Sequence, residues 1–208
     1  NFEYKHRIAD QLLASKLRSA GAVLIQGPKW CGKSTTAIQQ AKSNLMLGNP
    51  QTLRDSRTLL SIDSSLIMNG KTPRLFDEWQ TIPELWDTIR SEVDTRHELG
   101  QFILTGSAVP LETTQIQHTG TGRFAWLRMR PMSLWESEES NGAVSLGELF
   151  SGLNKKVLGE NKHTLQDIAH ILCRGGWPIT LSQHPNDALQ TAYNYVDAIA
   201  ESDISRVD

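Results

Sequence analysis

One stretch of eight residues near the amino terminus restricts the fold more than any other part of the sequence. Gly27-Pro28-Lys29-Trp30-Cys31-Gly32-Lys33-Ser34 fits the pattern G-x-x-x-x-G-K-[ST] at every fixed position. The apolar run Ala22-Val23-Leu24-Ile25 precedes the pattern, and a segment compatible with a helix, Ser34 to Gln40, follows it. Strand, loop and helix therefore come in the order that a phosphate-binding loop requires, and a nucleoside triphosphate is the predicted ligand.

The residue types in this stretch suit the chemistry of phosphate binding. Gly27 and Gly32 permit backbone angles that let successive N–H groups turn inward around phosphate oxygens, at the positive end of the following helix. Lys33 supplies an ammonium group for the β and γ phosphates, and the Ser34 hydroxyl is placed to ligate Mg²⁺. A glycine-rich turn without a ligand is the alternative. Among the variable positions of the loop, the Cys31 thiol is expected to be inert.

A second pattern follows at Arg74-Leu75-Phe76-Asp77, a short strand with an acidic carboxyl end, and the next residue is Glu78. In parallel α/β sheets the ligand lies beyond the carboxyl ends of the strands, so Asp77 is expected near the Mg²⁺ beside Ser34. Glu78 would then act as the general base that polarises the attacking water. Two solvated acids at a strand end are the alternative.

Two further segments supply candidates with weaker signals. Thr105 or Ser107, at the end of the predicted strand from Gln101 to Thr105, is expected to sense the γ phosphate, although Gly106 is equally compatible with a simple turn. Arg123 follows a glycine-rich segment and precedes the predicted strand from Phe124 to Leu127. Its rigid donor fork suits a γ phosphate in its own subunit or in a neighbouring one, and a surface salt bridge is the alternative.

Composition excludes several classes of protein. The 208 residues, 38% of them hydrophobic, suffice for one domain, or for a core with a smaller appendage. The formal net charge of −2 provides no global field for nucleic acid, and two distant cysteines make no disulfide framework. No apolar run reaches membrane-spanning length, so we expect a cytoplasmic protein. The acidic segment Glu136 to Gly142 divides a predicted core, residues 1–138, from a mainly helical region, residues 139–208.

Other elements are predicted from periodicity and turn residues. Beyond the acidic segment the chain is mainly helical and is broken at Gly175-Gly176-Trp177-Pro178. In the core we expect a helix within residues 5–19, a strand from Asn44 to Leu47, a helical stretch from Thr52 to Met68 and a helix from Thr81 to Leu99.

Taken in order, these segments resemble one family, the prokaryotic AAA-type P-loop ATPases that carry a carboxy-terminal domain of unknown function. The resemblance covers nearly the whole chain. Its residues are the phosphate-loop pattern, Pro73-Arg74-Leu75-Phe76-Asp77-Glu78-Trp79-Gln80, Pro83-Glu84-Leu85-Trp86-Asp87, Phe102-Ile103-Leu104-Thr105-Gly106-Ser107-Ala108, Thr121-Gly122-Arg123, Arg130-Pro131-Met132-Ser133-Leu134 and Gly175-Gly176-Trp177-Pro178.

The resemblance implies an α/β fold, a three-layer P-loop NTPase sheet of the AAA+/ASCE-like kind, followed by a small helical lid. It implies Mg²⁺ at Ser34 and Asp77 and hydrolysis through Glu78. Similar proteins continue well past a segment like Ser202-Asp203-Ile204, so the family's carboxy-terminal domain is expected to be absent here. The nucleotide contacts that it implies come from Gly27, Pro28, Lys29, Trp30, Cys31, Gly32, Lys33, Ser34 and Thr35.

The leading hypothesis is therefore Mg²⁺-dependent ATP binding and hydrolysis that drives or switches a partner or a carboxy-terminal domain. Lys33, Glu78, Thr105, Ser107 and Arg123 are the predicted catalytic residues. A switch or scaffold that binds ATP with little turnover and a small-molecule kinase are the alternatives, whereas a GTPase is disfavoured because no N-K-x-D segment is present. The expected partners are ATP and either another protein or further copies of the chain, with no strong nucleic-acid signal and no membrane.

Overall fold

The structure is a computed structural model that describes residues 3–106, 120–152 and 158–202. The chain divides into two compact units, Asn1–Arg130 and Pro131–Asp208, which are described separately below.

The first unit is built around a five-stranded sheet in which every pairing is parallel. Its order is β2-β3-β4-β1-β5, so β4 lies between the strand that precedes the phosphate loop and the strand that ends in Asp77. All five predicted strands are confirmed: β3 has the predicted bounds, and β1, β2, β4 and β5 differ from them by one residue at one or both ends. The strands are β1 (Ala22–Gln26), β2 (Ser43–Met46), β3 (Arg74–Asp77), β4 (Phe102–Gly106) and β5 (Phe124–Arg128).

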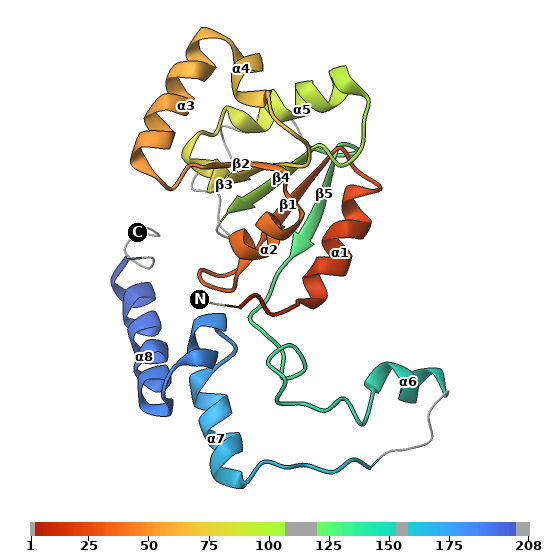
Figure 1. Cartoon of the computed structure of the whole chain (residues 1–208), viewed down its shortest axis with the longest axis vertical. Coiled ribbons are helices and arrows are strands. Elements are labelled where there is room, and N and C mark those ends of the chain that lie inside the picture. Colours follow the sequence, from red (N-terminus) through yellow and green to blue (C-terminus); the bar gives the residue numbers. More distant parts are fainter. Residues whose placement is uncertain (1–2, 107–119, 153–157, 203–208) are drawn as a thin grey trace. The chain divides into compact units, whose positions relative to one another are not determined.

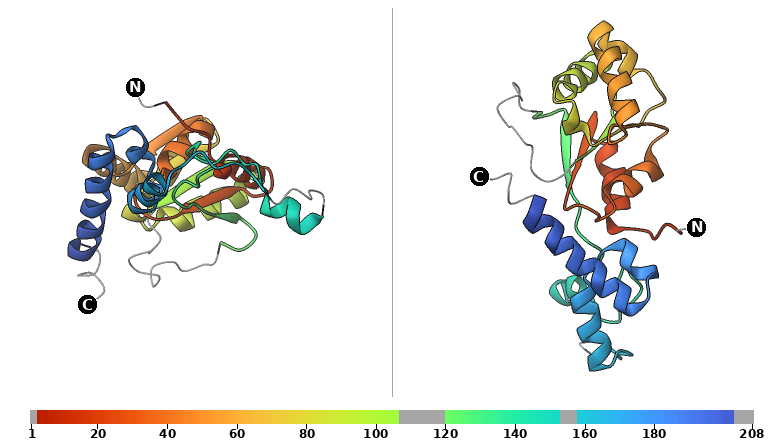
Figure 2. Two further views of the ribbon diagram at one scale, coloured as in Figure 1. Left: turned by 90° about the horizontal axis from the view of Figure 1, so that it is seen from below. Right: turned by 90° about the vertical axis from the view of Figure 1, so that its left-hand side faces the viewer.

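Helices cover both faces of this sheet, giving a three-layer α/β unit (Figures 1 and 2). On one face, α1 packs on β1 and β5 while α2 packs on β3 and β4. On the other face, Trp86 and Ile89 of α5 join the apolar side chains of the strands in the main core cluster. The central strands β1, β3 and β4 are mainly apolar because both of their faces are buried, and polar residues stand near their ends. The helices are α1 (Ile8–Leu17), α2 (Lys33–Gln40), α3 (Pro50–Ile62), α4 (Ser64–Met68) and α5 (Leu85–Arg96).

The helix predicted from Thr81 to Leu99 is shorter in the structure. Glu78 adopts a left-handed conformation with φ +56°, and a short 3-10 turn over Trp79–Thr81 follows it. The α-helix starts only at Leu85, and it ends where His97 turns to φ +53°. The residues after β3 are therefore used to turn the chain sharply rather than to extend the helix.

The second unit is helical and contains α6 (Leu146–Ser151), α7 (Leu165–Arg174) and α8 (Pro185–Ser202), with a 3-10 turn over Pro178–Ser182. The predicted break at Gly175 is confirmed, because α7 ends at Arg174 and Gly175 has φ +73°. The main-chain N–H of Met132 donates to the Gly176 carbonyl over 2.7 Å. In the described part of the chain, no helix combines the length and the apolar character needed to cross a membrane.

Candidate functional site

The predicted site residues gather at the carboxyl edge of the sheet because the strands are parallel. The phosphate loop leaves β1 after Gln26, and Asp77 ends β3. Between them lies β4, whose Thr105 is in register with Asp77 on one side and with Ile25 on the other. Residues that are far apart in the sequence are thereby brought to one place.

The phosphate loop has the conformation that its glycines predict at the start of α2. Gly32 caps the helix at φ +96°, in the left-handed region, and Trp30 also has a positive φ of +62° with its ring exposed. The Lys33 side chain is buried, and its Nζ donates to the carbonyl oxygens of Gly27 over 3.0 Å and Pro28 over 2.9 Å. The ammonium group therefore lies across the loop, where phosphate oxygens would replace the carbonyls.

The remaining loop positions differ in exposure. Lys29 and Thr35 are exposed, whereas Cys31 is fully buried. Burial raises the pKa of the Cys31 thiol, against the lowering effect of the positive charges of Lys33 and Arg7. A raised pKa keeps this thiol protonated at neutral pH, in agreement with the expectation that it is inert.

Asp77 connects the two sequence patterns. Its Oδ1 accepts a 2.5 Å hydrogen bond from Ser34 Oγ and another of 2.5 Å from Thr105 Oγ1, and its side chain is 7% exposed. Hydroxyl and carboxylate oxygens are the ligands that Mg²⁺ prefers. The oxygens of Ser34 and Asp77 thus fit the metal that the sequence predicts, with Thr105 fixing the carboxylate from the other side.

Glu78 is held by Gln80, a residue to which the sequence patterns assign no role. Gln80 Nε2 donates to Glu78 Oε2 over 2.5 Å. The other amide atom, Gln80 Oε1, is buried without a hydrogen-bond partner among the described residues. A Cβ placed on Gly106 would collide with it, so Gly106 lets the amide lie against the end of β4. In the sequence, Gln80 is marked by its position two residues after the predicted base and by its place at the end of the segment from Pro73 to Gln80.

The sequence at the end of β4 contains the two residues that were predicted to sense the γ phosphate, Thr105 and Ser107, with Gly106 between them. Gly106 belongs to the strand and pairs with Gln26, so it extends β4 instead of forming a turn. Ser107, the other candidate for sensing the γ phosphate, lies outside the described residues. Thr105 is described and fully buried beside Asp77.

Arg123 does not lie at this edge, so its position gives no support to the predicted action within its own subunit. It precedes β5, and its carbonyl accepts from the N–H of Ala22 at the start of β1, whereas the phosphate loop follows the end of β1. Five residues of parallel strand span roughly 16 Å, more than an arginine side chain can bridge. Its Nε instead donates to Asp94 Oδ1 over 2.8 Å, a bond that lowers the pKa of Asp94. A role in a neighbouring subunit stays a prediction.

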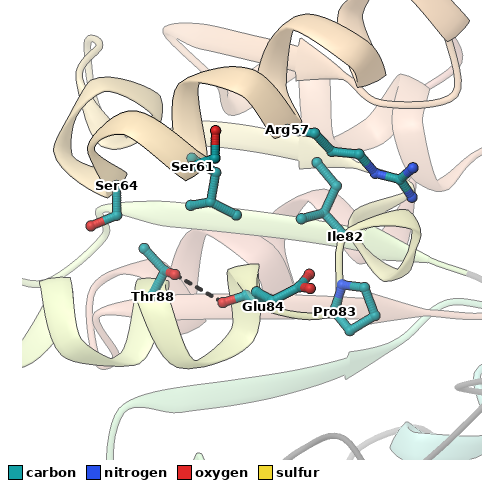
Figure 3. A pocket seen from close by; sticks show the side chains of 8 residues that line it. Arg57, Ser61, Ser64, Ile82, Pro83, Glu84 and Thr88 are labelled. Carbon is teal, nitrogen blue, oxygen red and sulfur yellow. Dashed lines mark hydrogen bonds between the residues drawn. The ribbon is translucent and has the colours of Figure 1, made fainter.

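The cavity in Figure 3 lies elsewhere in the first unit. Its volume is about 540 Å³, and its walls come from α3, the first residue of α4, Ile82 to Glu84 and α5. Arg57 at its rim donates to the carbonyl of Thr81 over 2.9 Å. No residue of the phosphate loop and neither acid of the second pattern lines it. We therefore place the candidate site at the sheet edge and not in this cavity.

Comparison with known proteins identifies the family. No curated protein matches the chain. Among solved structures, a signal transduction ATPase with numerous domains (STAND) that carries a tetratricopeptide repeat sensor, from Pyrococcus horikoshii, aligns at 14% identity and a TM-score of 0.43. The alignment covers 92% of this chain and 32% of that one. PCH-2 from C. elegans aligns at 12% identity and a TM-score of 0.37, over 93% of this chain and 66% of that one.

The sequence profile of a family described as an AAA domain matches residues 19–138, more than half of the chain. The matched segment includes the phosphate loop, all five strands and Asp77. The first unit thus has the three-layer core of a P-loop NTPase, and the chain belongs to the AAA-domain family.

Proposed function

We propose that this protein binds ATP together with Mg²⁺ at the carboxyl edge of the sheet and hydrolyses it to drive or switch a partner. The observation that carries the proposal is the position of Asp77. One carboxylate oxygen accepts hydrogen bonds from Ser34 of the phosphate loop and from Thr105 of β4. Membership of the AAA-domain family supports nucleotide binding. The hydrogen bonds of Asp77 support Mg²⁺ binding and ATP hydrolysis.

Each residue has a defined task in the proposed reaction. The loop N–H groups and Lys33 bind and orient the phosphates, and Ser34 with Asp77 would hold the metal. When bound, Mg²⁺ supplies positive charge that offsets the charge of the β and γ phosphates. The oxygen of a water molecule forms a bond to the γ phosphorus as the bond to the ADP oxygen breaks, and Glu78 accepts the proton of the water. The products are ADP and inorganic phosphate.

A second candidate is favoured by a specific contact. The hydrogen bond from Gln80 restrains the Glu78 carboxylate, which suits a protein that binds ATP as a switch and hydrolyses it slowly. Phosphate release over time, measured alone and with added partner proteins, separates slow turnover from efficient hydrolysis.

The test of nucleotide binding compares a lysine of the loop with an exposed lysine outside it. We expect Lys33→Ala to lose ATP affinity, because the loop N–H groups remain but the ammonium that reaches the β and γ phosphates is gone. Lys42→Ala is the matched control, since Lys42 is exposed and lies outside the loop, between α2 and β2. Isothermal titration calorimetry with ATP and Mg²⁺ measures both variants. Equal affinity of Lys33→Ala and the parent protein would contradict the proposal.

A further inference from the structure

The phosphate loop is in close contact with the residues that follow β5. The carbonyl of Gln26, just before the loop, accepts a 2.7 Å hydrogen bond from the N–H of Met129. A Cβ on Gly27 would collide with the main-chain oxygen of Met129, so this glycine is required for the close approach of the two segments. The first residue of the loop therefore packs directly against the exit of β5.

Arg7 joins the same two segments from a third part of the chain. Its side chain is 6% exposed, and Nη1 donates to the carbonyl of Cys31 in the loop over 2.8 Å. Nη2 donates to the carbonyl of Arg130 over 2.9 Å. A guanidinium can hold two carbonyls at once because its donors form a rigid planar fork, which a lysine ammonium does not reproduce.

The segment that carries Arg7 is itself fixed. The Arg7 N–H donates to Asp10 Oδ2 over 2.8 Å at the start of α1. Tyr4 Oη donates to the other oxygen of Asp10 over 2.5 Å and lies 3.1 Å from Thr36 Oγ1 of α2. Arg7 is therefore held by the helix that it caps, and Tyr4 links the start of that helix to α2, which follows the loop.

We propose that Arg7 is a positioning residue that couples the phosphate loop to Met129 and Arg130, so that nucleotide in the loop stabilises the exit of β5. The proposal rests on the proposed nucleotide-binding function. In a phosphate nest the N–H groups turn toward the anion, which directs carbonyls such as that of Cys31 away from it and toward groups like Arg7. When nucleotide binding fixes the Cys31 carbonyl, the Arg7 guanidinium that donates to it is fixed as well. The Arg130 carbonyl, which accepts from the same guanidinium, is then also held in place. The coupling is reciprocal, as any linkage between two equilibria must be.

The location of Arg130 at the end of the first unit suggests what this coupling does. Arg130 is the last residue of the first compact unit, and the chain continues from Pro131 into the helical unit. A change in the mobility of residues 128–130 therefore changes the mobility of the segment that leads into the second unit. Arg7 would thus pass nucleotide occupancy from the loop to the start of the connection.

Hydrogen exchange with mass spectrometry tests the coupling in the full chain. The probe is the slowly hydrolysed analogue AMP-PNP with Mg²⁺, and overlapping peptides resolve residues 27–35 and residues 128–130. In the parent protein we expect the analogue to slow exchange in both segments. In Arg7→Lys and Arg7→Gln we expect slower exchange in the loop alone, together with about tenfold weaker binding, the equivalent of one charge-assisted hydrogen bond. Arg18→Gln, an exposed arginine at the other end of α1, is the matched control and should behave as the parent does.

The outcomes separate this inference from the proposed function. If calorimetry detects no binding of the analogue to the parent protein, the proposed function fails and the inference fails with it. If the parent binds and the loop alone is protected, or if both Arg7 variants keep the protection at residues 128–130, the coupling is refuted while nucleotide binding stands. The comparison within the parent protein decides the matter even where Arg7→Gln does not fold.

Discussion

Glu78 occupies a left-handed backbone conformation that residues with a side chain rarely adopt. Such a conformation costs about 1–3 kcal/mol and persists only where neighbouring contacts maintain it. Those contacts are present, because the Glu78 carbonyl accepts from the N–H of Thr81 over 3.0 Å and from its Oγ1 over 2.8 Å. Gln80 binds the carboxylate itself. The turn after β3 thus fixes both the backbone and the side chain of the proposed base.

At the residue scale we predict that Glu78→Gln binds ATP but does not hydrolyse it. The amide keeps the shape of the side chain and leaves Ser34 and Asp77 unchanged, yet it does not accept the proton of the attacking water. The loss of phosphate release should be about 10²–10⁴-fold, as for a general base. Calorimetry measures binding and a phosphate-release assay measures turnover. Turnover at the parent rate would exclude Glu78 as the base.

Gln80→Ala tests whether the hydrogen bond from Gln80 orients the Glu78 carboxylate for hydrolysis. We expect ATP affinity to be retained and turnover to fall about tenfold, by the loss of one hydrogen bond that orients a charged group. A rise in turnover would mean that Gln80 restrains Glu78, as the switch candidate requires.

At the scale of elements, the sequence predicted what depends on local pattern. The apolar strand from Arg74 to Asp77 matches β3 residue for residue, and the glycine-rich loop lies where the pattern placed it. The start of α5 was missed, since no rule of helix periodicity reveals that Glu78 turns left-handed. The roles of Gln80 and Arg7 were missed because they depend on side-chain contacts. Gln80 binds the carboxylate two residues before it, and Arg7 binds carbonyls that are far away in the sequence.

The aromatic contact between α5 and the sheet gives a prediction about stability. Trp86 is 2% exposed, and its ring stacks on Phe124 of β5 with centroids 4.2 Å apart. A Cβ on Gly120 would collide with both rings, which indicates close packing. Trp86→Ala should lower the free energy of unfolding by about 3–5 kcal/mol, the usual cost of removing a large buried aromatic side chain.

Trp126→Ala is the control for this element, because the ring of Trp126 is 53% exposed although it lies only 6.1 Å from that of Trp86. Its loss of stability should be clearly smaller. Urea unfolding followed by circular dichroism compares the two variants. Equal losses would mean that burial of Trp86 does not set the stability of the α5 layer.

At the scale of the whole molecule, Arg123 shows what sequence order does not reveal. The residue follows a glycine-rich segment, which favoured a phosphate-facing role, but it precedes its strand instead of following it. In a parallel sheet the two ends of a strand lie at opposite edges, and the phosphate loop occupies the other one. For Arg123 to contact a nucleotide, that nucleotide would have to be bound by a second copy of the chain.

We predict that Arg123→Ala keeps ATP affinity and loses hydrolysis by a factor of about 10³ or more, as expected for an arginine that stabilises the transition state of a neighbouring site. Mixing it with Lys33→Ala should restore part of the activity, because a shared interface can then combine an intact loop with an intact arginine. Asp94→Ala breaks the same ion pair but leaves the guanidinium in place, so it should retain hydrolysis. Equal loss in Asp94→Ala and Arg123→Ala would mean that the pair is only structural. Full activity of Arg123→Ala, or no recovery in the mixture, would exclude action between subunits.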